Sequence, residues 1–445
     1  MVELDERGQR IYEDIYEAYI FAYPLVETVV YGRSKTNTVE AGSEQAPYNQ
    51  FAHNRNVWQP QEHKPGGPNM DVVYSMVSLD LKEDALIFHK PQTDRFYTFL
   101  ILDAYGTFRT LIGTGGLGGE KTGDYLIAGP GFSQETPAGV TRIDIPTRFA
   151  SGLLRIQTYG GQDVEKVHAL QKTTTIRPLS QSAGNGELPK GVFRPEYAYS
   201  SYEKMQTMGI EEFFSIFNEA MEENPILPED LEAYERYKNY QIGAGKHFAT
   251  ADFGDSALIE KIEAIPSSIL WKKEWKDVRN GWSFADADIA LPGEDYFQRA
   301  YNIHWGPGAN PAVASLYPMA AVDREGNALT GANAYVIHFE KGEIPPVKKY
   351  GYWSITPYTL QDLYLIENDA GIYKVGSETA LRYNEDGSLD LYIQREEVAP
   401  ELRSNWLPVG EGAFLLLLRL YIPEECAING AWKPPFIERR REDTV

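Results

Sequence analysis

The sequence lacks the residues and segments on which several classes of protein depend. Cys426 is its only cysteine, so no disulfide within the chain and no cysteine-based metal cluster can form. Its longest apolar run, residues 413–418, is far shorter than the roughly 20 residues that a membrane-spanning helix needs. We therefore expect a soluble chain with no membrane span, and the single cysteine suits a reducing compartment.

Positive charge is also scarce. Lys and Arg number 42 against 64 Asp and Glu, which gives a formal net charge of −22. Such a surface repels phosphate backbones and anionic lipids, so we expect no nucleic-acid partner. The first ten residues are charged and lack the basic, apolar and small-residue order of a signal peptide. As written the sequence fits the cytoplasm, and it fits the periplasm if a leader has been removed.

The organisation of the chain follows from its hydrophobic periods. A length of 445 residues predicts more than one domain. Apolar side chains recur at three- and four-residue steps from Ile11 to Val30, which predicts an amphipathic helix. The chain after it contains short runs of β-forming residues separated by Gly, Pro and Asp, which predict strands. We expect a mainly β protein with helical insertions (α+β). Its expected parts are an N-terminal helix (1–36), a β-sandwich (37–180), a linker and helical connector (181–300) and a second β-sandwich (301–445).

A glycine-rich stretch, LIGTGGLGGEKTGDYLIAGPG at 111–131, resembles a phosphate-binding loop at first sight. Gly113, Gly115 and Gly118 spell G-x-G-x-x-G, and Lys121 follows close by. That fingerprint requires a helix directly after the glycines, whereas a strand pattern ending in Gly-Pro-Gly follows here. The stretch therefore predicts a turn that needs glycine at positive φ, with no nucleotide cofactor.

Several motifs resemble a known pair of bacterial families. The first set is N-M-D-V-V-Y-S at 69–75, R-F-Y at 95–97, L-D-A-Y at 102–105 and G-D-Y-L-I-A-G-P-G at 123–131. These are similar to DUF1254, whose usual Thr is replaced by Val72. A second set is similar to its usual partner, DUF1214: Y-P-M-A-A-V-D at 317–323, Y-W-S-I-T-P-Y at 352–358 and R-L-Y-I-P at 419–423. The resemblance implies an immunoglobulin-like β-sandwich followed by a jelly-roll sandwich, and it supplies no reaction.

The strongest candidate for chemistry lies in the first β region. Asn69 and Asp71 stand two residues apart before a strand, and Asp103 ends a later strand. If these strands are neighbours, Asp71 and Asp103 could share acid and base roles, with Arg95 orienting them or the substrate. The side chains of Asn69, Tyr74 and Tyr97 would bind substrate. The alternative is that the carboxylates form turns and a structural Arg–Asp bridge.

Three further residues are candidates for substrate binding. His53 lies in the loop before the first strand, where it could act as a base or simply be solvated. Trp353 and Trp406 have polar neighbours and could line a pocket, although such aromatics also fill β-sandwich cores. The seven histidines are scattered and match no metal-binding motif, so we expect neither a metal nor a cofactor.

Three functions remain open. The first is a carboxylate-assisted hydrolase of an amide, ester or glycosidic bond, working in a cleft between the domains. The second is a non-catalytic protein that binds a glycan or small molecule, and the third is a structural protein that assembles through the 11–30 helix. We expect a homo-oligomer. Convergence of buried Asp71, Asp103 and Arg95 would favour the first hypothesis.

Overall fold

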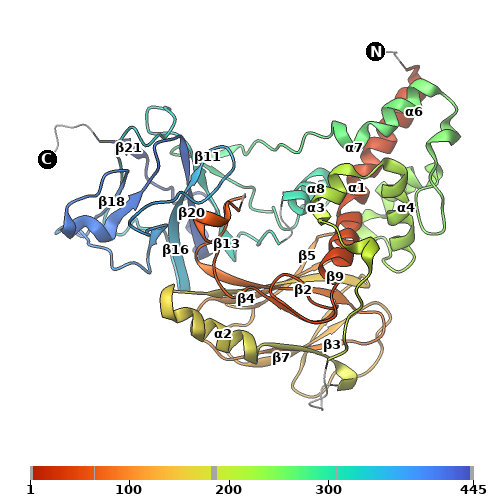
Figure 1. Cartoon of the computed structure of the whole chain (residues 1–445), viewed down its shortest axis with the longest axis horizontal. Helices are drawn as coiled ribbons and strands as arrows, with labels where there is room; N and C mark the ends of the chain where they lie inside the picture. The colour runs from red at the N-terminus through yellow and green to blue at the C-terminus, as the bar shows by residue number, and fades with distance from the viewer. Residues whose placement is uncertain (1–3, 65, 182–187, 306–307, 441–445) are drawn as a thin grey trace.

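The computed structural model describes residues 4–64, 66–181, 188–305 and 308–440. Two β-sandwiches and a layer of helices make up this part of the chain (Figure 1). The first sandwich lies at the bottom of the view, the second at its left, and the helices stand at the right above the first. The expected α+β class and the N-terminal helix are confirmed.

The first sandwich is built from a six-stranded and a four-stranded sheet. Val73, Phe99 and Leu154 belong to the core between the two sheets, while alternate residues on the same strands face outward. In spatial order, the larger sheet contains β1 (Ala52–His53), β2 (Val72–Asp80), β9 (Phe149–Gln157), β4 (Tyr97–Asp103), β5 (Phe108–Gly113) and β6 (Leu117–Gly118). The smaller contains β10 (Thr175–Pro178), β3 (Leu86–Lys90), β7 (Gly123–Ala128) and β8 (Thr141–Asp144), and α2 (Val164–Thr173) precedes β10.

The long helix α1 (Glu6–Lys35) is the centre of the helical layer. Asp5 caps its first turn by accepting a hydrogen bond from the backbone N–H of Gly8 at 2.7 Å. Its apolar face is covered within the chain, where Tyr19 stacks on Phe213. The surrounding helices are α3 (Ser201–Thr207), α4 (Ile210–Met221), α5 (Leu231–Tyr237), α6 (Ser256–Glu263), α7 (Ile265–Ser268) and α8 (Tyr296–Trp305). None of the helices in the described ranges combines the length and hydropathy of a membrane span.

The second sandwich begins earlier in the chain than residue 301. β11 (Asp277–Arg279) and β12 (Trp282–Phe284) join its larger sheet, so the expected connector contains two of its strands. The rest of that sheet is β13 (Ser315–Leu316), β14 (Met319–Ala320), β20 (Phe414–Pro423), β16 (Val347–Thr359) and β17 (Val375–Gly376). The smaller sheet is β19 (Trp406–Pro408), β18 (Leu389–Gln394), β15 (Tyr335–Phe339) and β21 (Ile437–Arg439), and α9 (Glu425–Ile428) follows β20. The immunoglobulin-like and jelly-roll assignments stay predictions, and residues 182–187 of the expected linker lie outside the described ranges.

The glycine-rich stretch forms turns, as the sequence predicted. Gly113, Gly115 and Gly118 have φ of 110°, 75° and 75°. A Cβ on Gly113 would lie 2.0 Å from the carbonyl oxygen of Tyr97, so only glycine fits there. The two-residue strand β6 follows in place of a helix, and it pairs in parallel with β5.

Candidate functional site

The two candidate carboxylates lie at opposite ends of one sheet. β2 and β4 both pair antiparallel with β9, so they run in the same direction. Asp71 precedes the first residue of β2, whereas Asp103 is the last residue of β4. Asp71 lies opposite Thr158 and Asp103 opposite Ala150, a separation of eight residues along the strand between them, which corresponds to roughly 26 Å at the rise of a β-strand. The expectation that Asp71 and Asp103 share one hollow is therefore wrong.

Asp71 is completely buried in a polar network between the two sandwiches. Its Oδ1 accepts a hydrogen bond from Lys374 Nζ at 2.6 Å, and its Oδ2 accepts bonds from Ser354 Oγ at 2.6 Å and Tyr421 Oη at 3.1 Å. Asn69 donates to Tyr421 Oη at 2.7 Å and accepts the backbone N–H of Asp71. Burial raises the pKa of Asp71, but Lys374 and nearby Arg419 outweigh burial and hold that pKa below its usual value.

This interdomain cluster joins motifs from both regions that carry the family resemblance. Phe96 of the R-F-Y motif packs its ring edge on Tyr421, with centroids 5.0 Å apart. Tyr421 also stacks on Tyr352 of the Y-W-S-I-T-P-Y motif at 4.2 Å. Because Asp71 and Tyr421 are fully buried, the cluster as it stands holds the sandwiches together and offers no open site for a substrate.

Arg95 and Asp103 have separate partners. Arg95 forms two hydrogen bonds with Asp163, at 2.8 and 3.1 Å, and these fix the loop before α2. Asp103 pairs with Arg109 and accepts the backbone N–H groups of Tyr105 and Thr107. Burial raises the pKa of Asp103 by more than Arg109 lowers it. The alternative interpretation from the sequence therefore describes both residues. Asp103 stabilises a turn, and Arg95 forms a structural bridge, although its partner is Asp163, which the sequence analysis did not name.

Three of the expected binding side chains lie in the cores of the two sandwiches or their sheets, apart from the Asp71 cluster. Tyr97 is buried in the first core with its hydroxyl on Thr174, and Trp353 is buried in the second core. Trp406 is buried as well and donates its indole N–H to the carbonyl of Gln394. The pocket-lining roles expected for Trp353 and Trp406 are therefore wrong.

His53 lies on β1 and Tyr74 on β2, where Tyr74 packs against the apolar side chains of the interdomain cluster. His53 Nδ1 lies 2.8 Å from Ser75 Oγ, and burial, followed by nearby Arg55, lowers the pKa of His53 to about 4. Tyr74 is partly exposed on the outer face of β2, where the guanidinium of Arg155 lies over its ring. A neutral His53 is not the strong base that the sequence suggested near pH 7.

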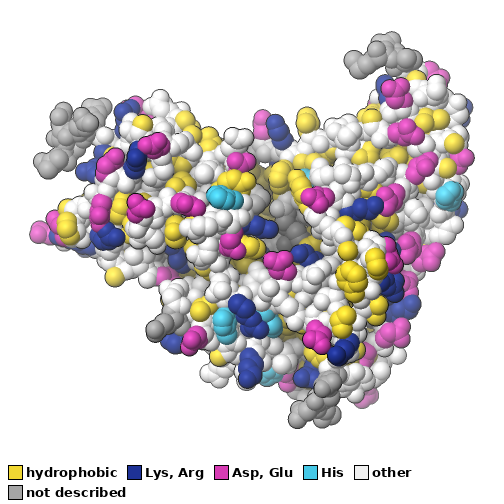
Figure 2. All heavy atoms as spheres, in the orientation of Figure 1, with side chains coloured by type: hydrophobic (Ala, Val, Ile, Leu, Met, Phe, Trp, Pro, Cys, Tyr) yellow, Lys and Arg dark blue, Asp and Glu magenta, His cyan; other side chains and the backbone are white. Residues whose placement is uncertain are grey.

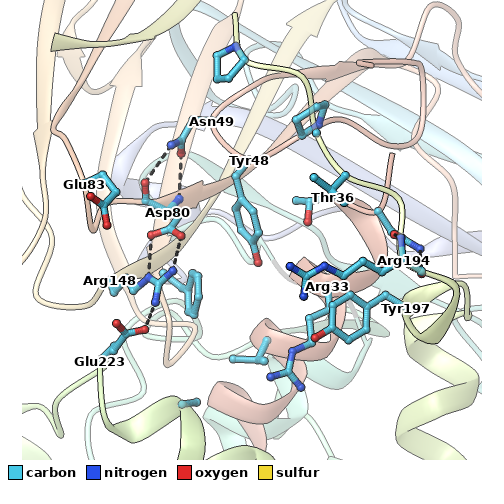
Figure 3. A pocket seen from close by; sticks show the side chains of 18 of the residues that line it. Arg33, Thr36, Tyr48, Asn49, Asp80, Glu83, Arg148, Arg194, Tyr197 and Glu223 are labelled. Atoms are coloured by element: carbon cyan, nitrogen blue, oxygen red, sulfur yellow. Dashed lines mark hydrogen bonds and ion pairs between the residues drawn. The ribbon is translucent and has the colours of Figure 1, made fainter. Parts of the chain in front are cut away.

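A cavity of about 790 Å³ opens where α1, the first sandwich and the 189–197 segment meet (Figure 3). That volume lies within the range of small-molecule sites. Asp80 and Arg148 form two hydrogen bonds on one wall, at 2.8 and 2.6 Å, and Glu223 pairs with the same guanidinium. On the opposite wall the guanidinium groups of Arg33 and Arg194 lie over the ring of Tyr197, at 5.5 and 5.8 Å from its centroid. Tyr48 stands between the walls.

Local sequence explains the shape of this cavity. Tyr48 reaches α1 because Gly32 has no side chain, and a Cβ there would lie 2.8 Å from Tyr48 Oη. Asn49 exchanges two hydrogen bonds with the backbone of Asp80, each 2.9 Å long, and so fixes the loop to the end of β2. Burial and the charge of Asp80 raise the pKa of Tyr48 to about 12, so its hydroxyl stays protonated at neutral pH.

Sequence reasoning missed this cavity because its walls come from five separate stretches of chain. The Tyr48–Asn49 pair lies inside a stretch that the sequence marked only as a long loop. No local period or motif joins Arg33 to Arg148 or Arg194. As for metals, His, Cys, Asp and Glu side chains of the described residues form no group of three that could hold an ion.

Comparisons with known proteins place the chain in a family. DUF1254, described as a protein of unknown function, matches residues 48–178, and DUF1214, described in the same way, matches residues 314–425. A crystal structure of a protein from Vibrio parahaemolyticus has a TM-score of 0.73 at 20% identity, covering 97% of this chain and 100% of that one. Another, of an uncharacterized protein from Burkholderia cenocepacia, has a TM-score of 0.45 at 12% identity, with 97% and 93% covered. A search of the curated proteins gave no match. The chain therefore belongs to the two-domain family in which a DUF1254 region is followed by a DUF1214 region.

Proposed function

We propose that this protein binds a small zwitterionic molecule in the cavity beside α1. The observation that carries the proposal is the uneven charge across that cavity: three carboxylates surround the single guanidinium of Arg148 on one wall, and the guanidinium groups of Arg33 and Arg194 lie on the other (Figure 3). A ligand with a cationic and an anionic end, such as a short peptide, would match both walls. The rings of Tyr48 and Tyr197 would contact its middle.

Each wall carries one charged side chain that has no ion-pair partner among the described residues. Glu83 forms no ion pair with any described residue, and the guanidinium of Arg194 likewise has no carboxylate partner within those ranges. Arg33 pairs with Glu219 at 3.0 Å, but the Glu219 side chain is 67% exposed. Such an exposed pair contributes little, so an anionic ligand group can compete for Arg33.

The other functions expected from the sequence have less support. Hydrolysis by a carboxylate pair needs two facing carboxylates, whereas Asp71 and Asp103 lie at opposite ends of a sheet. Assembly through the 11–30 helix needs an open apolar face, whereas that face of α1 packs against α4 and α8. Glycan binding on Trp353 or Trp406 needs exposed indoles, and both are buried.

Isothermal titration calorimetry with three matched peptides tests the proposal. Glycyl-L-tyrosine carries both charges, its N-acetyl form lacks the cation, and its C-terminal amide lacks the anion. We expect the zwitterion to bind at least about tenfold more tightly than either blocked form, or about 1.4 kcal/mol. Arg194→Gln removes the charge that would bind the carboxylate, so this variant should bind the zwitterion no more tightly than the amide. Glu83→Gln removes the charge that would bind the ammonium group, so it should bind the zwitterion no more tightly than the acetylated form.

Arg395→Gln is the matched control, because Arg395 pairs with Glu411 on the second sandwich, away from the cavity. This variant should bind the three peptides as the wild type does. Equal affinity for all three peptides, or no binding of the zwitterion, would contradict the proposal.

A further inference from the structure

A second site lies on one face of α1. Tyr23, Glu27 and Tyr31 are spaced four residues apart, so their side chains follow one another along the helix. Glu27 is only partly exposed, yet its carboxylate forms no hydrogen bond or ion pair with any described residue. A carboxylate in this position is costly to leave without a partner.

The hydroxyl groups around Glu27 form hydrogen bonds with residues other than Glu27. The hydroxyl of Tyr23 lies 2.8 Å from His304 Nδ1, and the hydroxyl of Tyr31 donates to Met76 Sδ at 3.4 Å. Tyr199 donates to the carbonyl of Val30 at 3.5 Å. Aromatic rings form much of the neighbourhood, since the Trp271 ring lies 4.6 Å from that of Tyr23. The Glu27 carboxylate is thus close to several tyrosines and accepts no hydrogen bond from any described residue.

The titratable groups near Glu27 supply no positive charge. Those facing it are Tyr19, Tyr23 and Tyr31 on α1 and Tyr199 before α3. Burial raises the pKa of Glu27 to about 8. Burial also lowers the pKa of His304 to about 4, so the imidazole bonded to Tyr23 is neutral near pH 7. Among the residues that the structure describes, Glu27 therefore has no counter-cation.

We propose that this face of α1 binds a small organic cation through an ammonium group. A carboxylate among aromatic rings is the arrangement that recognises ammonium groups, because ring faces and the carboxylate both attract the cation. A hard metal ion fits poorly, since Ca²⁺ and Mg²⁺ require six or more oxygen ligands and Glu27 belongs to no group of three potential metal-binding side chains among the described residues. The net charge of −22 also concentrates cations at the surface, where Figure 2 shows acidic side chains over all three parts.

This ammonium site is separate from the zwitterion cavity. Arg33 and Val29 of α1 line that cavity, whereas Tyr23, Glu27 and Tyr31 do not. Binding at one site can therefore be tested without the other, and a failure of either proposal leaves the second unchanged.

Titration calorimetry with tetramethylammonium chloride tests the proposal, with sodium chloride keeping the ionic strength constant. Ionisation of a carboxyl with a pKa of about 8 predicts about 30-fold tighter binding at pH 9 than at pH 6.5. Near pH 7 the binding should release close to one proton, measured by comparing buffers of different ionisation enthalpy. Glu27→Gln should abolish both the binding and the proton release.

Glu260→Gln is the matched control, because Glu260 is an exposed residue on α6. It should bind tetramethylammonium with the affinity of the wild type. The pH comparison on the wild type requires no substitution, so it stands even if Glu27→Gln folds poorly. Wild-type binding that is absent at pH 9 or equal at the two pH values would overturn the proposal, as would undiminished binding by a folded Glu27→Gln variant.

Discussion

Asp71 is the centre of the polar contacts between the two sandwiches. Replacing it by asparagine keeps the shape of the side chain but leaves Lys374 and buried Arg419 without their carboxylate. Removing one partner of a buried ion pair costs about 3 to 5 kcal/mol. We expect Asp71→Asn to lower the free energy of unfolding by about that amount in urea denaturation. Asp94→Asn, at an exposed position, should change it by less than about 0.5 kcal/mol.

The same residue predicts how stability depends on acid. Because the folded pKa of Asp71 is below its ordinary value, its ionised form stabilises the protein above about pH 4. That contribution is lost as pH falls below about 4 through the folded pKa. We therefore expect the difference in unfolding free energy between wild type and Asp71→Asn to be constant from pH 5 to 7 and to shrink below pH 4. A difference that grows on acidification would contradict the low pKa.

Residue identity drew attention to two members of this network, although the sequence predicted catalytic and binding roles for them. The sequence singled out Asp71 and Asn69, and both lie in the interdomain cluster. It could not supply their partners, because Ser354 and Lys374 are 283 and 303 positions away along the chain. A contact between residues so far apart in the chain depends on how the two domains pack, and local sequence patterns do not predict that packing.

At the scale of elements, α1 shows how one glycine shapes the cavity wall. Gly32 lies inside the helix, where alanine would normally be more favourable by about 1 kcal/mol. Here the added Cβ would meet Tyr48 Oη at 2.8 Å, so we expect Gly32→Ala to destabilise the protein by about 1 to 2 kcal/mol. In a Tyr48→Phe background, which lacks that oxygen, the same change should become neutral or stabilising. Urea denaturation of the four proteins measures this coupling, and additive effects would show that Tyr48 is not the obstacle.

Strand patterns predicted the elements better than their directions. Short β-type runs predicted the strands β2, β4 and β9, and the glycine-rich stretch predicted the turn after β5, where the glycines have positive φ. The interpretation of Asp71 and Asp103 as a pair failed because β9 inserts between β2 and β4. Two strands on either side of a common antiparallel partner run the same way, so the start of one lies far from the end of the other.

At the scale of the whole molecule, the family motifs meet where the two sandwiches pack. Buried aromatic rings surround the Asp71 network there, and Phe96 of the first sandwich packs edge-on against the stacked pair of Tyr352 and Tyr421 from the second. Both sets of motifs were recognisable in the sequence, but their convergence was not, because each set is typical of an independent domain. The homo-oligomer expected from the sequence stays a prediction.

This packing predicts that the sandwiches unfold together. In scanning calorimetry we expect one transition for the wild type, because charged and aromatic contacts couple the two cores. Phe96→Ala removes the ring that joins them, so it should split the transition into two. Phe88→Ala is the matched control, since that ring lies wholly in the first core and its loss should lower the melting temperature without splitting the transition. If both variants unfold in a single step, the coupling does not depend on Phe96, and the Asp71 network must be enough to hold the sandwiches as one cooperative unit.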